Sequence, residues 1–114
     1  MTIKFRSLTD VDEIGRYAAA TSLSGYIDIS YADLVAKLGE STDCFDDYKS
    51  DAEWIIQFGN GQIATIYNYK DGRNYMGADG KDKEDIREWH IGGRGAAVLK
   101  SVSELFPGNV VTEM

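Results

Sequence analysis

Hydrophobic positions along the chain recur at helical spacing in two segments. In the first, Tyr31, Leu34 and Leu38 fall on one face of a helix. Ser30 stands where an N-cap is expected, and Gly39 follows as a stop signal. These signals predict an amphipathic helix over residues 31–38. The second stripe predicts a helix from about Arg94 to Phe106, and its apolar residues are Val98, Leu99, Val102, Leu105 and Phe106.

Alternation of apolar and polar residues predicts antiparallel strands elsewhere. The clearest signal covers residues 53–70 around Asn60-Gly61, a dipeptide typical of a two-residue type I′ turn. Such a turn places Phe58 opposite Ile63, and the remaining pairs follow from that register. The predicted apolar face of this hairpin consists of Trp54, Ile56, Phe58, Ile63, Thr65 and Tyr67.

Weaker signals predict the other elements. Short strands are expected over residues 2–6 and 26–29, and a helix from residue 9 or 10 to about residue 20. A turn at Asp71-Gly72 would lead into a third hairpin strand over residues 73–77, followed by a fourth strand over 85–91. The predicted fold is a single α+β domain over residues 1–114. It has two layers, with an antiparallel β-meander of about four strands packed by two to three helices.

Composition narrows the function classes. The chain has 114 residues, 43% of them hydrophobic, which is enough for a packed core. Its net charge of −7 argues against direct binding to nucleic acid or to an anionic membrane. One cysteine excludes an intramolecular disulfide, and no signal segment or membrane-spanning run is recognisable. We therefore expect a cytoplasmic protein.

Most of the negative charge lies in one short stretch. Residues 40–53 hold six acids and only one base, and a smaller acidic loop covers residues 79–85. One interpretation is a loop that charge keeps solvated; the other is a patch that binds a basic partner. Tyr48 would supply an aromatic anchor within such a patch. The predicted partner-binding residues are Asp43, Asp46, Asp47, Tyr48 and Asp51.

The glycine-rich turn at residues 92–95 is the second candidate site. Bare amides at the start of a helix, together with Arg94, suit a phosphate or another anion. The spacing falls short of the dinucleotide fingerprint, and the preceding hairpin is the wrong context for it. A tight turn that needs glycine is the alternative interpretation. The predicted ligand-binding residues are Gly93, Arg94, Gly95 and His90.

The sequence predicts no catalytic residue, no metal site and no cofactor. His90 and Glu88 would share one side of a strand, so a Glu–His pair is possible. The alternative is that a lone histidine on a strand is a hydrogen-bonded structural residue or an exposed one. The acids around Cys44 raise the pKa of a thiol, which works against a reactive cysteine. The acids at 43–51 and 79–82 do not match the EF-hand spacing.

Several motifs resemble small proteins encoded by tailed phages and prophages, over about residues 25–94. They are Gly25-Tyr26-Ile27, Tyr31-Ala32-Asp33-Leu34, Leu38-Gly39-Glu40, Asp51-Ala52-Glu53-Trp54, Ala64-Thr65-Ile66-Tyr67-Asn68-Tyr69-Lys70 and Glu88-Trp89-His90-Ile91-Gly92-Gly93. The order of elements is also similar to lipoprotein and inhibitor domains of the BLIP/SmpA type. In those domains, a short helix ending in Leu-Gly precedes an antiparallel sheet. No catalytic residue is carried over from either group.

The phage resemblance implies one class of function. Small acidic phage proteins often inhibit host enzymes or defence systems, as antirestriction and anti-CRISPR proteins do, and many occupy a basic nucleic-acid channel. The resemblance thus implies a non-enzymatic module that binds a basic surface of a host protein in the host cytoplasm. A small anion- or nucleotide-binding protein, which could be a homo-oligomer, is the alternative.

Overall fold

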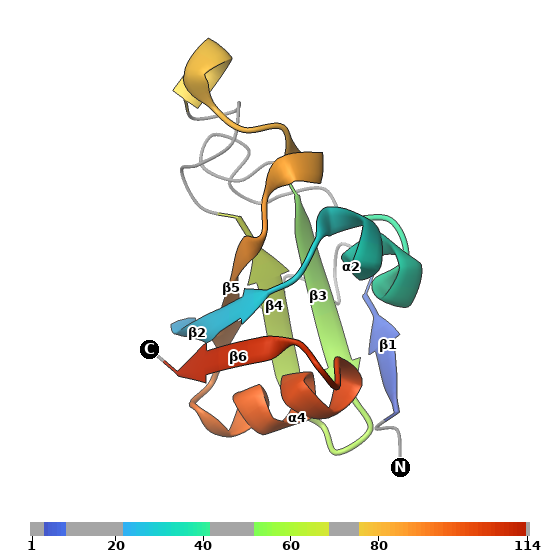
Figure 1. Cartoon of the computed structure of the whole chain (residues 1–114). Helices are drawn as coiled ribbons and strands as arrows, with labels where there is room; N and C mark the ends of the chain where they lie inside the picture. The colour runs from blue at the N-terminus through green and yellow to red at the C-terminus, as the bar shows by residue number, and fades with distance from the viewer. Residues whose placement is uncertain (1–3, 9–21, 42–51, 69–75, 114) are drawn as a thin grey trace.

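The computed structural model describes residues 4–8, 22–41, 52–68 and 76–113, and Figure 1 shows their arrangement. Within these ranges the fold is α+β, with one antiparallel sheet of six strands and two α-helices. The strands lie in the order β1-β3-β4-β5-β2-β6. They are β1 (Phe5–Ser7), β2 (Ser22–Asp28), β3 (Glu53–Phe58), β4 (Ile63–Tyr67), β5 (Glu88–Gly93) and β6 (Val110–Glu113). The helices are α2 (Tyr31–Leu38) and α4 (Ala97–Leu105), with short 3-10 turns η1 (Gly77–Asp79) and η2 (Lys83–Asp85).

Helix α2 begins and ends where its sequence predicts. The Ser30 side chain accepts a hydrogen bond from the Asp33 backbone N–H at 3.1 Å, which satisfies one otherwise unpaired amide of the first turn. At the other end, the Gly39 N–H donates to the Val35 carbonyl at 2.8 Å. Leu34 and Leu38 are buried. The predicted helix over residues 31–38 is confirmed.

The β3–β4 hairpin forms, but the predicted register is wrong by one residue. The Gly61 N–H donates to the Phe58 carbonyl, and the Phe58 N–H donates to the Gln62 carbonyl, each at 2.9 Å. The loop is therefore three residues long, not two. Gly61 has φ of 88°, the left-handed conformation that follows a type I turn in such loops. As a result Gln57, not Phe58, lies opposite Ile63.

The shifted register changes which β4 residues face the main core. Residues directly opposite one another share a face of the sheet, so Ile66 joins Trp54 and Ala64 joins Ile56. These four residues and Phe58 belong to the main buried cluster. Residues of the opposite face form a second, smaller buried cluster, which consists of Leu8, Ile55 and Ile63.

The strand beside β4 is also different from the predicted one. The described end of the predicted strand 73–77 is not extended, because Gly77 begins the 3-10 turn η1. Strand β5 pairs with β4 instead, and it starts at Glu88 rather than at residue 85. The rest of that predicted strand, the Asp71-Gly72 turn and the predicted helix near 9–20 lie outside the described residues.

The sheet has six strands, not about four, because its second half contains pairings that the sequence did not predict. Strand β2 is longer than the predicted 26–29 segment and pairs with both β5 and β6. Strand β6 follows the Pro107-Gly108 turn and forms one edge of the sheet. Strand β1 covers residues 5–7, so it ends one residue later than the strand predicted over residues 2–6. It forms the other edge of the sheet.

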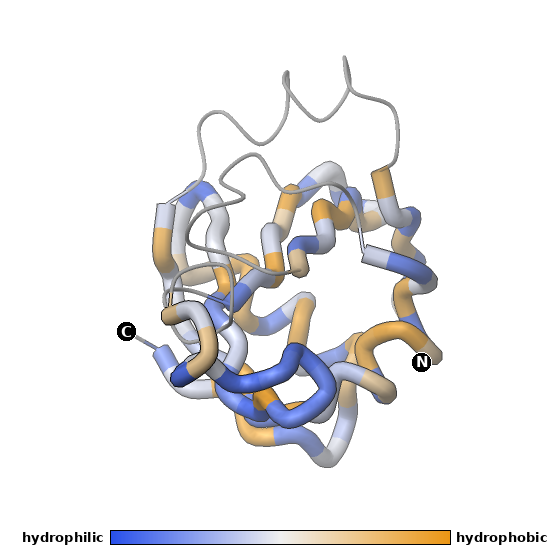
Figure 2. Tube along the Cα trace, turned by 90° about the horizontal axis from the view of Figure 1, so that it is seen from above, coloured by the Kyte–Doolittle hydropathy of each residue, from blue (hydrophilic) through white to orange (hydrophobic). Residues whose placement is uncertain are grey.

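Helix α4 begins at Ala97, three residues later than predicted, and ends at Leu105. Its apolar stripe, with Val98 and Val102, belongs to the same buried cluster as the strand residues. Along the strands and helices, apolar and polar positions are interleaved, whereas one stretch of the trace is continuously hydrophilic (Figure 2). This interleaving is expected where each strand or helix contributes one face to a core.

Candidate functional site

The residues predicted to bind a partner lie outside the described part of the chain. This applies to all five of them: Asp43, Asp46, Asp47, Tyr48 and Asp51. The structure does describe both ends of the acidic stretch. Glu40 is exposed just after α2, and Ala52 is buried just before β3. The Ala52 N–H donates to the Asn68 side-chain carbonyl at 3.1 Å, which ties the end of the stretch to the sheet.

The structure brings the second acidic segment close to the start of the first. Lys83 of η2 lies over the Tyr31 ring of α2, with its Nζ 5.1 Å from the ring centre. The pKa of the Lys83 amine is raised above its ordinary value. The largest cause is a hydrogen bond to the Tyr31 side chain, followed by the charge of Tyr31, and the carboxylates of Glu84 and Glu40 add smaller contributions. Lys83 of η2 and Tyr31 of α2 are thus in contact, although they are 52 positions apart in the sequence. The exposed acids of this second segment are Asp79, Asp82, Glu84 and Asp85.

An aromatic cluster supports this acidic end of the molecule. Trp54 and Trp89 are fully buried and meet edge to face, with ring centres 5.5 Å apart. Tyr31 lies 5.7 Å from Trp54 and 6.3 Å from Trp89. Both indole N–H groups are satisfied, since Trp54 donates to the Gly39 carbonyl at 2.9 Å and Trp89 to the Ile86 carbonyl at 3.2 Å. The ends of the acidic segments are thus attached to elements that this buried aromatic cluster packs together.

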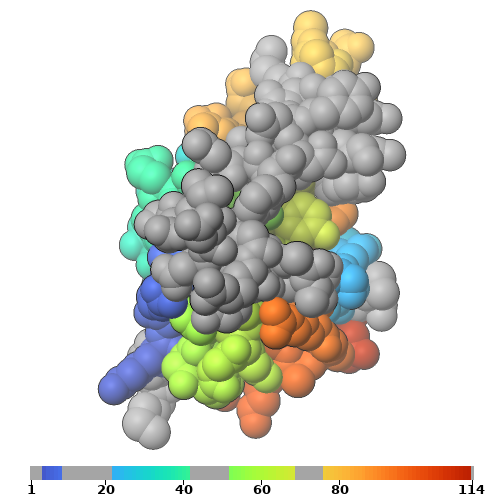
Figure 3. Space-filling view, turned by 180° about the vertical axis from the view of Figure 1, so that it is seen from behind, coloured from blue at the N-terminus to red at the C-terminus, as the bar shows by residue number. Residues whose placement is uncertain are grey.

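The glycine-rich turn lies beside a surface hollow of about 360 Å³. Arg94 and Gly95 line it on one side, together with Ala97 and Val98 at the start of α4. Residues 60–63 of the hairpin loop and β4 line the other side. In the view from behind, the hairpin and the start of α4 are neighbours at the lower end of the molecule (Figure 3). The first turn of α4 has no side-chain cap, although the Leu99 N–H donates to the Ala96 carbonyl at 3.0 Å.

Polar side chains connect the two walls of this hollow. The Asn60 Nδ2 donates to Gln62 Oε1 at 3.3 Å and to Ser101 Oγ at 3.5 Å, and Ser101 also donates to Gln62. The Asn60 side-chain oxygen accepts from the Gln62 N–H at 3.0 Å. Sequence reasoning missed this network. The Asn60-Gly61 signal identified the loop, but nothing local showed that it contacts α4.

The glycines of the turn have structural roles that the sequence only partly predicts. A Cβ atom on Gly92 would collide with the Thr65 hydroxyl, and one on Gly93 with the Val98 side chain. These two glycines belong to β5 and allow close packing of β4 and α4 against it. Gly95 has φ of 147°, so a glycine conformation is needed there. Tight packing thus accounts for these glycines, while Arg94 and Gly95 also face the hollow.

The structure does not bring His90 to this hollow. The His90 ring lies between the rings of Tyr26 on β2 and Tyr67 on β4, the two strands that flank β5. The ring centres are 5.1 Å and 5.4 Å away. Glu88 lies on the same face of β5, two residues earlier, and opposite Asp28 of β2. His90 therefore belongs to a row of aromatic side chains across the sheet. It does not line the hollow beside α4 that Arg94 and Gly95 line.

In the described ranges, no group of three or more histidine, cysteine, aspartate or glutamate side chains is placed to hold a metal ion. Among the same residues, no helix is long and apolar enough to cross a membrane. Comparison of the chain with known protein families, with curated proteins and with solved structures finds no match. The phage and BLIP/SmpA resemblances therefore stay predictions.

Proposed function

We propose that the protein is a non-enzymatic binding module whose acidic surface occupies a basic surface of another protein. The observation that carries this proposal is the contact between the second acidic segment and α2, where Lys83 Nζ lies 5.1 Å from the centre of the Tyr31 ring. The first acidic segment begins at Glu40, just after α2. Two acidic segments far apart in sequence thus adjoin the same helix, α2. Charges gathered on one part of a surface attract a basic partner more strongly than scattered charges do.

The mechanism is substitution for nucleic acid. Carboxylates spread over a surface can take the place of phosphates against lysine and arginine, and their field speeds the encounter. On the phage resemblance, the partner is a host nucleic-acid-handling or defence protein. The residues proposed for contact are Asp43, Asp46, Asp47, Tyr48 and Asp51. The protein then acts by occupying the partner's site, with no cofactor and no bond made or broken.

A double substitution tests the acidic surface. The protein is used to capture host proteins, and the affinity of each purified partner is measured at about 50 and 200 mM salt. We expect binding to weaken with salt and the Asp46→Asn, Asp47→Asn variant to bind at least about tenfold more weakly. Glu104→Lys changes the net charge by the same amount at an exposed position on α4, so it should retain affinity. Unchanged affinity in the double variant would rule out this contact surface.

A second candidate function is favoured by the hollow beside the glycine-rich turn. Its lining combines Arg94 with the uncapped start of α4, an arrangement that suits a phosphate-bearing ligand such as a nucleotide. The test is the melting temperature with inorganic phosphate, ADP and ATP at millimolar concentration. Stabilisation should vanish in Arg94→Ala and persist in Arg87→Ala, which removes an exposed arginine elsewhere. No shift with any of the three would exclude this function.

A further inference from the structure

The two edges of the sheet differ in how far they are covered. Strand β1 is tied to α2, since the Ser7 hydroxyl donates to the Leu38 carbonyl at 2.8 Å. Strand β6 pairs with β2 on one side, and no described residue pairs with its other side. Val110 is 64% exposed, and Thr112 and Glu113 are exposed as well. In an antiparallel pair, alternate residues direct their N–H and C=O groups away from the partner strand, so β6 presents hydrogen-bonding groups outward.

A hollow of about 250 Å³ lies on one face of the sheet next to this edge. Val110 of β6 and Glu88 of β5 are both opposite Asp28 of β2, so these three side chains share a face. Thr112 and Tyr26 form the next row of that face. Backbone and side-chain atoms of seven residues line the hollow: Tyr26, Ile27, Asp28, Arg87, Glu88, Val110 and Thr112.

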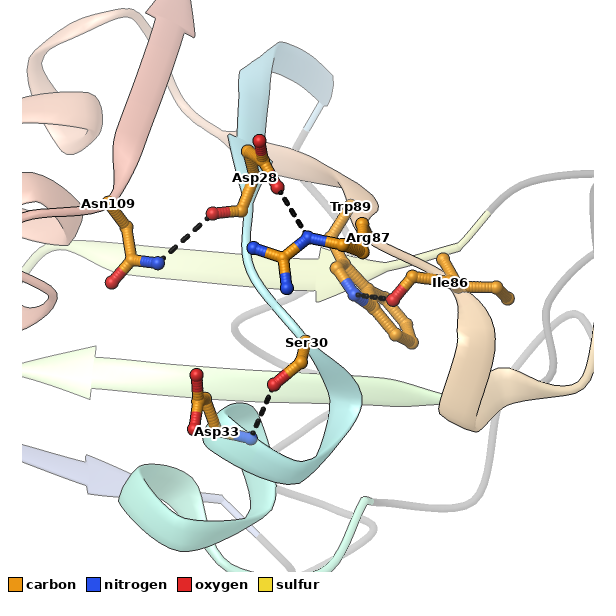
Figure 4. Close-up of polar contacts among 7 residues, drawn as sticks. All are labelled: Asp28, Ser30, Asp33, Ile86, Arg87, Trp89 and Asn109. Atoms are coloured by element: carbon orange, nitrogen blue, oxygen red, sulfur yellow. Dashed lines mark hydrogen bonds and ion pairs between the residues drawn. The ribbon is translucent and has the colours of Figure 1, made fainter.

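The charged groups at this hollow leave one carboxylate available. Arg87 Nε donates to Asp28 Oδ1 at 2.9 Å, and both side chains are more than half exposed (Figure 4). The Glu88 carboxylate has no hydrogen bond or ion pair to any residue that the structure describes. Asn109 fixes the start of β6, because its side-chain amide donates to the Asp28 carbonyl at 3.0 Å. Strand β6, anchored at its start by Asn109, thus borders a hollow whose lining includes the carboxylate of Glu88.

We propose that β6 is a strand-addition site for an extended segment of a partner protein that carries lysine or arginine at alternate positions. A strand added to β6 places every second side chain on the face of Val110 and Thr112. A lysine or arginine there can extend over β6 with its alkyl stem against Val110. Its charge is then attracted by the carboxylates of Asp28 and Glu88, which lie two and three strand positions away on the same face. Self-pairing of two β6 strands is opposed by the net charge of −7 that each copy carries. The site is independent of the acidic stretch at 40–53.

Titration with a designed peptide tests the proposal. The probe is a blocked octapeptide of alternating threonine and lysine, added to the full chain while backbone amide signals are followed by NMR. We expect the largest shifts, and slower amide exchange, at residues 110–113 of β6. A peptide with glutamate in place of lysine should leave β6 unchanged. If the lysine peptide shifts only signals outside β6, or if the glutamate peptide binds equally well, the proposal is wrong.

Two exposed substitutions make the test specific. Glu88→Lys should weaken peptide binding about tenfold, because it replaces the available carboxylate by a like charge. Glu104→Lys, with the same change in net charge on α4, should bind as the unaltered protein does. Val110→Lys places a charge on the edge and should also weaken binding. If instead the protein alone forms a dimer that Val110→Lys dissociates, as judged by sedimentation, β6 pairs with a second copy and the proposal is overturned.

Discussion

The two ends of the sheet are stabilised in different ways. At the end near α2 and η2, two buried tryptophans pack against each other and both indole N–H groups are bonded to carbonyls. At the end near the hairpin loop and α4, the contact is made by the polar side chains of Asn60, Gln62 and Ser101 beside an open hollow. We call these the aromatic end and the polar end.

The difference shows where each part of the surface can take on a function. At the aromatic end, the charged segments start from a core that fixes their attachment points. At the polar end, the packing leaves space that a ligand could occupy. Substitutions in the aromatic core should therefore lower stability strongly, whereas those at the polar end should lower it less. Four predictions test this order.

The largest loss is expected from Trp89→Ala. Trp89 has no exposed surface, and removing a buried tryptophan side chain leaves a cavity that lowers the free energy of unfolding by about 3–5 kcal/mol. Urea denaturation followed by circular dichroism measures this loss. Val110→Ala, at an exposed position, should change stability by less than about 0.5 kcal/mol. If Trp89→Ala does not fold, Trp89→Phe should fold with a smaller loss of unfolding free energy. If Trp89→Ala lowered the free energy of unfolding by less than about 1 kcal/mol, the difference between the two ends would be contradicted.

Ser101→Ala tests the polar end. It removes a buried hydroxyl that bonds Gln62 and Asn60, so we expect a loss of about 1–2 kcal/mol. Alanine also favours the helix, and Ser103→Ala measures that gain at an exposed position of α4. The difference between the two variants in thermal or urea unfolding gives the value of the network. Equal stability of both variants would show that the network contributes nothing.

Ser30→Ala should have a smaller effect at the aromatic end. The substitution removes the oxygen that accepts from the Asp33 N–H, and loss of such a cap lowers stability by about 1 kcal/mol. Ser30→Asp keeps an acceptor and should retain most of the stability. Urea unfolding of the three proteins checks this order. If the aspartate variant loses as much as the alanine variant, capping is not the cause.

The smallest effect is expected from Lys83→Met, and it should depend on pH. The pKa of Lys83 is raised above its ordinary value of 10.5, mainly by Tyr31, so the protonated form stabilises the folded state. This stabilisation is present below that ordinary value and is lost as the pH rises through the raised pKa. Because Lys83 is partly exposed, we expect a loss of at most about 0.5 kcal/mol at pH 7. The difference between the two proteins in urea unfolding should shrink as the pH rises above 10.5; a difference that stays constant with pH would contradict the assignment.

Local signals in the sequence were sufficient for some elements. Helix α2 was predicted at its observed bounds, because its cap, its apolar spacing and its stop residue all lie within ten residues. The hairpin was located correctly, but Gly61 allowed a longer loop than Asn60-Gly61 suggested, and the register moved by one residue. Loop length depends on how the flanking strands pack, which local residues do not reveal.

The candidate sites were less predictable, because residues distant in sequence build them. The sequence identified Arg94 and Gly95, but it did not show that Asn60 and Gln62 lie across from them and bond Ser101 of α4. The sequence grouped His90 with the glycine-rich turn at residues 92–95. In the structure, the His90 side chain instead packs against the rings of Tyr26 and Tyr67. Strand β6 was not predicted, since four residues after a turn carry little periodic signal.

The sequence by itself determined the α+β class, helix α2, the existence of the hairpin and the concentration of acids at residues 40–53. These properties depend on neighbouring residues, whose spacing and capping act over one or two turns of chain. The tertiary structure decided the strand order, the position of β6 at one edge among the described strands, and the hollows beside α4 and beside β6. These depend on pairings between distant segments, and such pairings are chosen by burial of the whole core rather than by any local pattern.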